Sequence, residues 1–160
     1  MAAFADLQFY RINGRYLVKE FALVTEESQI VHYVFGPPPI IDWNHDDLKN
    51  NDWVYRYHHG LHWFSGFVPY QETLKKIANS LKRNDIFVIY VKGYEKMKFL
   101  EKFDVNVQNI ENCGLVYKIK DVRNGISCLH HREKNNVCAL RNVFHMKNCM
   151  SLPPLSVDPR

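Results

Sequence analysis

Two cysteines and a histidine near the end of the chain have the types and spacing of metal ligands. Cys128, His131 and Cys138 form a Cys-x2-His-x6-Cys pattern within eleven residues. Thiolates and imidazoles are donors that zinc prefers, and structural zinc sites arrange four ligands in a tetrahedron. Two ligands three residues apart can converge from one turn, while the third arrives from the start of a following helix. The pattern therefore indicates a structural Zn²⁺ site.

A plain structural role is an equally good interpretation of the spacing alone. In this interpretation Cys128 and Cys138 are small buried apolar residues. His131 is then a surface histidine beside His130. The remaining cysteines, Cys113 and Cys149, have no partner ligand at suitable spacing, and we interpret them as buried thiols.

Length and composition favour one globular domain. The chain has 160 residues, of which 46% are hydrophobic, and we expect a domain over residues 1–150 followed by a flexible, proline-containing tail at 151–160. The first residues lack the pattern of a secretory signal, and no stretch is apolar for long enough to cross a membrane. We therefore expect an intracellular protein, cytoplasmic or nuclear, without membrane association. In that reducing environment, cysteines near histidines favour metal over disulfides.

The first third of the chain reads as three consecutive strands. Apolar and aromatic residues dominate 4–10, 16–24 and 29–35. Asn13-Gly14 is a strong hairpin signal between the first two strands, and three prolines follow the third. The pattern predicts an antiparallel meander.

The middle of the chain alternates between helical and strand patterns. Residues 37–68 lack periodicity, and we expect a loop with one helical turn near 46–50. Residues 70–82 then carry Leu74, Ile77, Ala78 and Leu81 at helical spacing. A strand at 86–91, a helix from Gly93 and a strand at 105–110 complete the pattern. This order predicts an α/β fold with a mixed sheet, three antiparallel strands followed by parallel strands, and helices on both faces. That is the ribonuclease H-like order.

Residues 126–143, which read ISCLHHREKNNVCALRNV, resemble the zinc motif of the Maelstrom domain, a ribonuclease H-like fold of the piRNA pathway. In that family a Glu-Cys-His-Cys set replaces exonuclease chemistry, and the glutamate lies on the second strand. The segment VKEFA at 18–22 is similar in place and pattern, so the resemblance implies that Glu20 is the fourth ligand. An unpaired carboxylate on an apolar strand would be costly, and a metal would remove that cost.

The chain also resembles DEDDh exonucleases more distantly, through GLHW at 60–63 and IYVKGYEKMKFL at 89–100. It departs from them at the acidic positions: the first acidic pair reads Asp6-Leu7-Gln8, the second acid falls near Lys96, and the last is replaced by Cys138. Two-metal hydrolysis needs several carboxylates around the ions. We therefore assign no catalytic residue and expect that nuclease chemistry is lost.

The net charge of +4 arises from one region. Residues 71–103 hold eight Lys or Arg against four Asp or Glu, while the rest of the chain holds thirteen of each. Lys92, Lys96 and Lys98 follow the central strand, and we take them as candidate contacts to a phosphate backbone. A solvated helix face is the equal alternative.

An aromatic and histidine-rich segment allows two further interpretations. His58, His59 and His62 with Trp53 and Trp63 could form a second metal site or a base-stacking platform. We favour an aromatic loop that packs over the sheet edge.

Two function classes follow. The resemblance implies a non-catalytic module that binds RNA or a protein of a silencing complex, in small-RNA or transposon silencing, with no small-molecule substrate. The alternative is a single-strand ribonuclease of DEDDh or unconventional mechanism. We favour the binding module.

Overall fold

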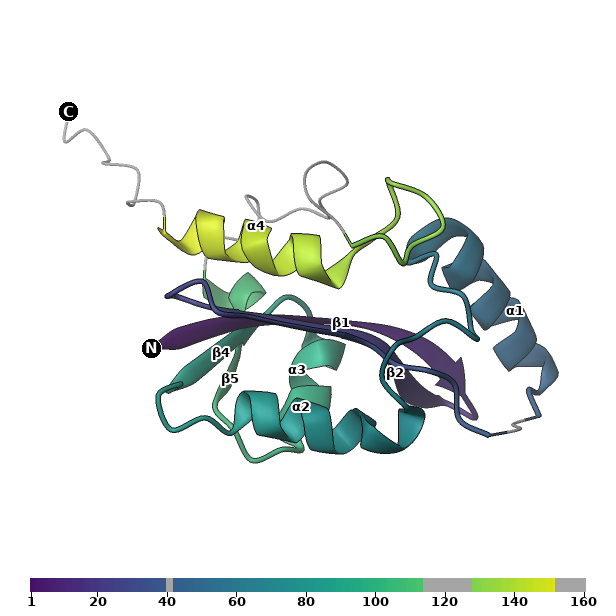
Figure 1. Ribbon diagram of the computed structural model, residues 1–160, viewed down its shortest axis with the longest axis horizontal. Helices are drawn as coiled ribbons and strands as arrows, with labels where there is room; N and C mark the ends of the chain where they lie inside the picture. The colour runs from purple at the N-terminus through teal and green to yellow at the C-terminus, as the bar shows by residue number, and fades with distance from the viewer. Residues whose placement is uncertain (40–41, 114–127, 152–160) are drawn as a thin grey trace.

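The computed structural model describes residues 1–39, 42–113 and 128–151. Within these ranges five strands form one sheet in the order β3-β2-β1-β4-β5 (Figure 1). They are β1 (Ala2–Ile12), β2 (Arg15–Thr25), β3 (Ile30–Val34), β4 (Val88–Val91) and β5 (Val107–Asn109). The first three strands pair antiparallel, whereas β4 runs parallel to β1 and β5 parallel to β4. The predicted α/β class and mixed sheet are confirmed.

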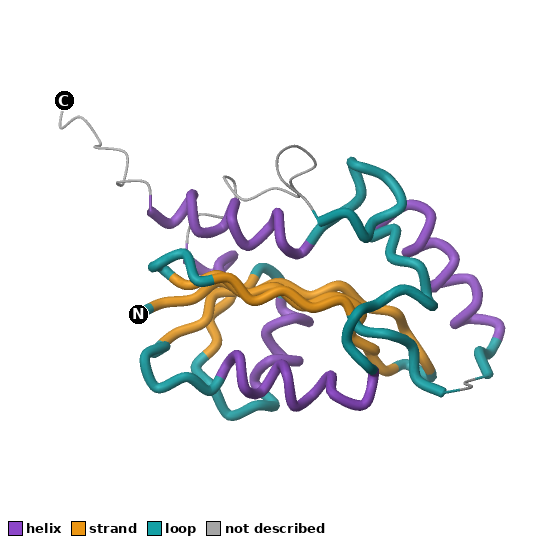
Figure 2. The backbone as a smooth tube through the Cα atoms, in the orientation of Figure 1, coloured by secondary structure: helices purple, strands orange, loops and turns teal. Residues whose placement is uncertain are grey.

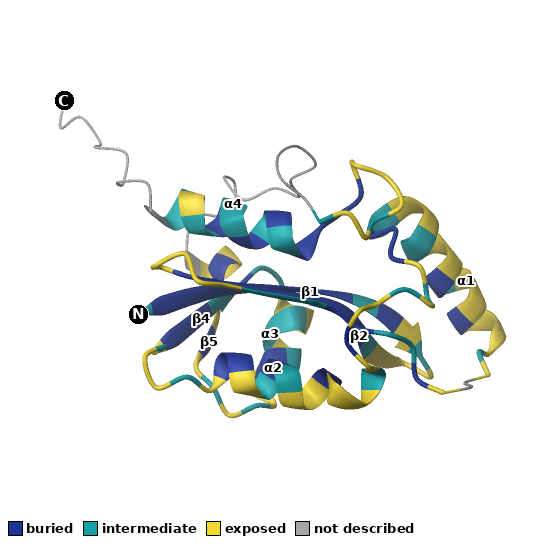
Figure 3. Cartoon of the chain, in the orientation of Figure 1, coloured by how far each residue is buried: buried dark blue, intermediate teal, exposed yellow. Residues whose placement is uncertain are grey.

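Helices cover both faces of the sheet (Figure 2). On one face lie α2 (Thr73–Leu81) and α3 (Tyr94–Glu101), and on the other lies α4 (Ala139–Ser151). Each face buries its own apolar cluster: Ile77, Leu81 and Leu100 pack on one side, and Val143 and Met146 pack on the other. The sheet is therefore buried on both faces along its middle (Figure 3).

The β1–β2 hairpin contains an irregularity that matters for the site. Asn13 and Gly14 form its two-residue turn with φ values of 50° and 75°, as the Asn-Gly pair predicts. Gln8 pairs with Glu20, but Phe9 pairs with Val18, so the register shifts between Gln8 and Phe9. Lys19 is the extra residue of this β-bulge, which bends the strand and redirects side chains beside it.

Helix α1 (His45–Trp53) is longer than the single turn that we predicted near 46–50, and it continues as a π-helix over Val54–His58. Its buried residues are Asp47 and Asn51. Asn51 exchanges hydrogen bonds with the backbone of Arg11, and the Asp47 carboxylate accepts one from the N–H of Asn13. Because this helix docks through polar side chains, hydrophobic periodicity does not reveal it.

Smaller differences also have physical causes. Leu74, expected on the core face of α2, is 63% exposed, since the buried face of this helix runs through Thr73, Ile77, Ser80 and Leu81. The two parallel strands are shorter than the predicted ranges 86–91 and 105–110, and Phe87 before β4 is exposed. Within the described ranges, no helix has the length and apolar character needed to cross a membrane.

The bulge residue Lys19 is a fully buried cation. Its ammonium donates to the carbonyl oxygens of Phe35 (2.8 Å) and Trp63 (2.7 Å), and also to that of Ser65. Burial lowers the pKa of Lys19 to about 8. The three carbonyls belong to two segments that leave the sheet, so one side chain ties the loop around residues 63–65 to β2.

We predict that Lys19→Met destabilises the protein by about 2–3 kcal/mol, because three buried carbonyls lose a charged donor. Urea unfolding followed by circular dichroism measures the effect. Lys49→Met, at an exposed position of α1, is the matched control and should change stability little. Equal stability of both variants would show that the three hydrogen bonds contribute nothing net.

Candidate metal centre

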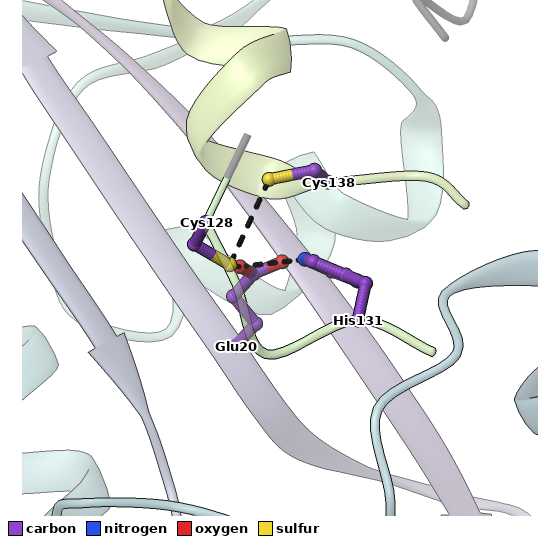
Figure 4. Close-up of side chains that lie close together, drawn as sticks. All are labelled: Glu20, Cys128, His131 and Cys138. Carbon is purple, nitrogen blue, oxygen red and sulfur yellow. Dashed lines mark hydrogen bonds and ion pairs between the residues drawn. The ribbon is translucent and has the colours of Figure 1, made fainter. Parts of the chain in front are cut away.

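Four side chains from distant parts of the chain meet above the sheet. Glu20 comes from β2, Cys128 and His131 come from the segment before α4, and Cys138 immediately precedes that helix. One potential ligand atom from each lies within 4.8 Å of the others, and they point toward a common centre (Figure 4). The structure therefore brings together all four predicted ligands, in a group that could hold a metal ion.

The distances within this cluster fit a tetrahedral zinc ion. The two sulfur atoms are 3.9 Å apart, against roughly 3.8 Å for two thiolates on one tetrahedral zinc. The Cys128 Sγ lies 3.3 Å from Glu20 Oε2, and His131 Nε2 lies 3.2 Å from the same oxygen. Typical zinc bond lengths put these two pairs at roughly 3.6 and 3.4 Å. Small shifts would thus accommodate the ion.

Glu20 is the most constrained of the four residues, with no solvent exposure. Its Oε1 accepts the backbone N–H of Ala139 at the start of α4 (2.8 Å), and its Oε2 lies 2.8 Å from His32 Nε2. Burial alone would raise the pKa of Glu20, but hydrogen bonds from His131 and His32 outweigh it and hold the pKa below its ordinary value. The carboxylate is therefore ionised and aimed at the cluster.

His131 is oriented through its second ring nitrogen. Its Nδ1 donates to the backbone carbonyl of His59, which leaves Nε2 facing Glu20 and the sulfur atoms. Metal-binding histidines commonly donate their other N–H in this way, which fixes both tautomer and ring orientation. A β-bridge between Leu61 and His131, and a hydrogen bond from the Arg132 N–H to the Gly60 carbonyl (2.7 Å), hold the backbone there.

The close approach of these two segments depends on Gly60. It has a φ of 62°, and a Cβ atom there would lie 2.1 Å from Asn136 Oδ1 and 2.9 Å from the Arg132 nitrogen. A larger residue at position 60 would therefore push the segment of residues 128–138, here called the metal-binding segment, away from the His59 carbonyl that orients His131.

The contact between the two cysteines shifts the pKa values of their thiols in opposite directions, and with burial it raises the pKa of Cys128. The hydrogen bond between the two thiols lowers the pKa of Cys138, and the contact with His131 contributes in the same direction against burial. A thiolate at this position is the form that binds zinc. A cysteine nucleophile paired with His131 is the competing chemistry, but Cys138 is fully buried and offers no path to a substrate. The arrangement is suited to holding an ion.

The three lysines proposed to contact phosphate have different environments. Lys96 Nζ lies 2.5 Å from Asp6 Oδ1, and the Asp6 side chain is only 2% exposed. The other oxygen of Asp6 accepts from Asn142 (3.0 Å) and Gln8 (3.3 Å). Lys98 is exposed, 3.5 Å from Glu101, and Lys92 is half-buried just after β4. The ammonium of Lys96 thus points toward the buried carboxylate.

The aromatic loop divides into inward and outward side chains. Trp63 packs edge-on against Tyr10 and Trp43, and His59 is buried, with its Nε2 3.0 Å from the Phe9 carbonyl. These two residues match the packing interpretation. Trp53 and His62 are instead exposed.

The other two cysteines differ in what can be described. Cys149 is half-buried, with its Sγ 3.6 Å from His145 Nε2, whereas the Cys113 side chain lies outside the described part of the chain.

Sequence reasoning missed the residues that support the ligands. His32 of β3 has its Nε2 2.8 Å from Glu20 Oε2, so it holds the carboxylate without being one of the four clustered residues. Alternation on β3 places it beside Ala22 of β2, so strand register could have suggested this neighbour. The roles of His59 and Ala139 come from their backbone groups, which carry no sequence signal.

We predict about one zinc per chain after extensive dialysis, measured by elemental analysis. Cys128→Ser or His131→Ala should lose the metal and lower the melting temperature, because structural zinc contributes roughly 10–16 kcal/mol of binding energy in small peptides. Glu20→Gln should weaken binding less, since water can occupy a fourth position and the amide oxygen can still accept from Ala139.

The control is Cys149→Ser, which removes a thiol outside the cluster and should keep both metal and stability. Protein that carries no zinc as purified, and whose melting temperature a strong chelator does not change, would contradict the assignment.

We compared the chain with known protein families, curated proteins and solved structures. No protein-family model, curated protein or solved structure matches the chain. The metal centre is thus supported by the convergence of its own donors.

Proposed function

We propose that the chain is a non-catalytic binding module of ribonuclease H-like, Maelstrom-like fold, with zinc held by Glu20, Cys128, His131 and Cys138. Its partner is RNA or a protein of a silencing complex. Three antiparallel strands followed by two parallel ones, with helices on both faces, support the fold. The Glu-Cys-His-Cys cluster supports the family.

The ion pair between Lys96 and Asp6 carries the non-catalytic part of the proposal. Two-metal phosphodiester hydrolysis needs several carboxylates at ions about 3.5–4 Å apart. Around Asp6 this chain instead has an ammonium, two amides and a single carboxylate. Among these four side chains Asp6 carries the only negative charge, and the Lys96 ammonium already compensates it. A divalent cation would therefore gain little electrostatic binding energy at Asp6. The fourth position expected to be acidic is Cys138, which belongs to the zinc cluster.

The geometry also refines the expected contact with nucleic acid. Lys98 is 51% exposed, while the Lys96 side chain is 24% exposed and engaged with Asp6. Lys98 is therefore more accessible to a phosphate than Lys96, while Lys92 stays a candidate through its position directly after β4. A phosphate contact by Lys96 would have to break its ion pair with Asp6.

We predict no cleavage of labelled single-stranded RNA or DNA in Mg²⁺ or Mn²⁺, because the carboxylates for two ions are missing. Gel electrophoresis of the labelled strands is the measurement. Asp6→Asn separates a real activity from a contaminant, since only a real one depends on this carboxylate. Strand shortening by the wild type that disappears in Asp6→Asn would establish the ribonuclease alternative.

If RNA is the partner, binding should weaken steeply with salt, with a log-log slope near −0.7 for each neutralised phosphate. The double variant Lys92→Glu/Lys98→Glu should then reduce affinity and flatten the slope by roughly 1.4 in fluorescence anisotropy. Arg15→Glu/Lys49→Glu has the same net charge, at exposed positions of β2 and α1, and is the control. Equal affinities of the two variants would place the contact elsewhere.

A further inference from the structure

The two sulfur atoms of the metal centre are close enough to form a disulfide bond after a modest movement. Their separation of 3.9 Å must fall to about 2.05 Å in a disulfide. Cys138 is fully buried beside the first turn of α4, and its neighbours fix its position. Cys128 is half-buried, lies in a segment without helix or strand, and precedes a turn at residues 129–130. The movement can therefore come from Cys128.

The two cysteines differ in how easily a small reactant can reach them. Cys128 is half-buried and its neighbour Leu129 is 99% exposed, so the chain reaches the surface directly beside the first cysteine. Cys138 is fully buried at the start of α4, and its sulfur is directed toward that of Cys128 (Figure 4). A small oxidant thus meets Cys128 first, and Cys138 is placed to react with the product.

We propose that Cys128 and Cys138 are a redox modification site, at which a peroxide converts the two zinc ligands into a disulfide and releases the metal. The proposal rests on the zinc site described above. It does not depend on whether the partner is RNA or protein.

The chemistry balances without a further reactant. The Cys128 thiolate attacks one peroxide oxygen, so an S–O bond forms, the O–O bond breaks, and the leaving hydroxide takes up a proton as water. The Cys138 thiolate then attacks the sulfenic sulfur of Cys128, the S–S bond forms, and the second oxygen leaves as hydroxide and is protonated to water. Two electrons from the two sulfurs reduce one peroxide to two waters. The zinc ion loses two of its four donors.

The remaining ligands have other partners, which explains why oxidation need not unfold the domain. Glu20 keeps its contacts with His32 and with the Ala139 N–H, and His131 keeps the His59 carbonyl. The disulfide retains the tie between Cys128 and the start of α4. What is lost is the link through the metal from this segment to β2.

The experiment uses the zinc-loaded chain with Cys113→Ser and Cys149→Ser, so that only the proposed pair can react. After treatment with hydrogen peroxide, zinc is followed with a chromophoric chelator, free thiols are counted, and the intact mass is measured. We expect one zinc released for each intramolecular disulfide, with two thiols lost and the circular dichroism spectrum retained. Dithiothreitol with added zinc should restore the starting state.

Several results would overturn the proposal. Zinc that stays bound with both thiols reduced would show that the pair is protected. Sulfinic or sulfonic products, or disulfides between chains, would show that Cys138 does not resolve the first product. Because these readouts involve neither nucleic acid nor a partner protein, their failure is separate from failure of the binding proposal. A chain that purifies without zinc would instead remove the metal assignment itself.

Discussion

The structure depends on one buried carboxylate, that of Glu20 at the middle of β2. A carboxylate with no access to water is unfavourable unless charges and donors surround it. Glu20 collects its partners from three other elements: His32 from β3, the Ala139 N–H from α4, and the ligands of the segment that precedes α4. A zinc ion would complete this set with a positive charge. The requirement to compensate one charge thereby joins segments more than a hundred residues apart.

A second buried carboxylate on the adjacent strand is compensated in a different way. Asp6 pairs with Ala22, and Gln8 pairs with Glu20, so both acids lie on the same region of the sheet beneath α4. The Asp6 carboxylate pairs with the ammonium of Lys96. The Glu20 carboxylate instead lies among two cysteine sulfurs and an imidazole nitrogen. Helix α4 serves both, since its first turn provides the Ala139 N–H to Glu20 and Asn142 to Asp6. Two carboxylates on one region of the sheet are therefore held by different sets of partners.

The sequence predicted those features that arise from local pattern. The Asn-Gly turn, the apolar runs of the strands and the apolar spacing in α2 lead directly to the observed elements, and the Cys-x2-His-x6-Cys spacing leads to three ligands. Glu20 required a resemblance, because its distance to the other ligands follows from tertiary structure alone. Helix α1 escaped prediction because Asp47 and Asn51 form its buried side. The bulge at Lys19 and the carbonyl of His59 are backbone features that side-chain patterns do not encode.

The same constraints position the outer loops. The segment around residues 60–68 is fixed to the sheet by the Lys19 ammonium and to the metal-binding segment by the Leu61–His131 bridge. On these two anchored segments, Phe64 is 75% exposed, Phe67 is 54% exposed and Leu129 is almost entirely exposed. Apolar side chains held at the surface on constrained loops are typical of interaction sites. Because the four clustered side chains hold one side of this surface and the Lys19 ammonium holds the other, these apolar side chains stand on backbone that the buried charges of β2 keep in place.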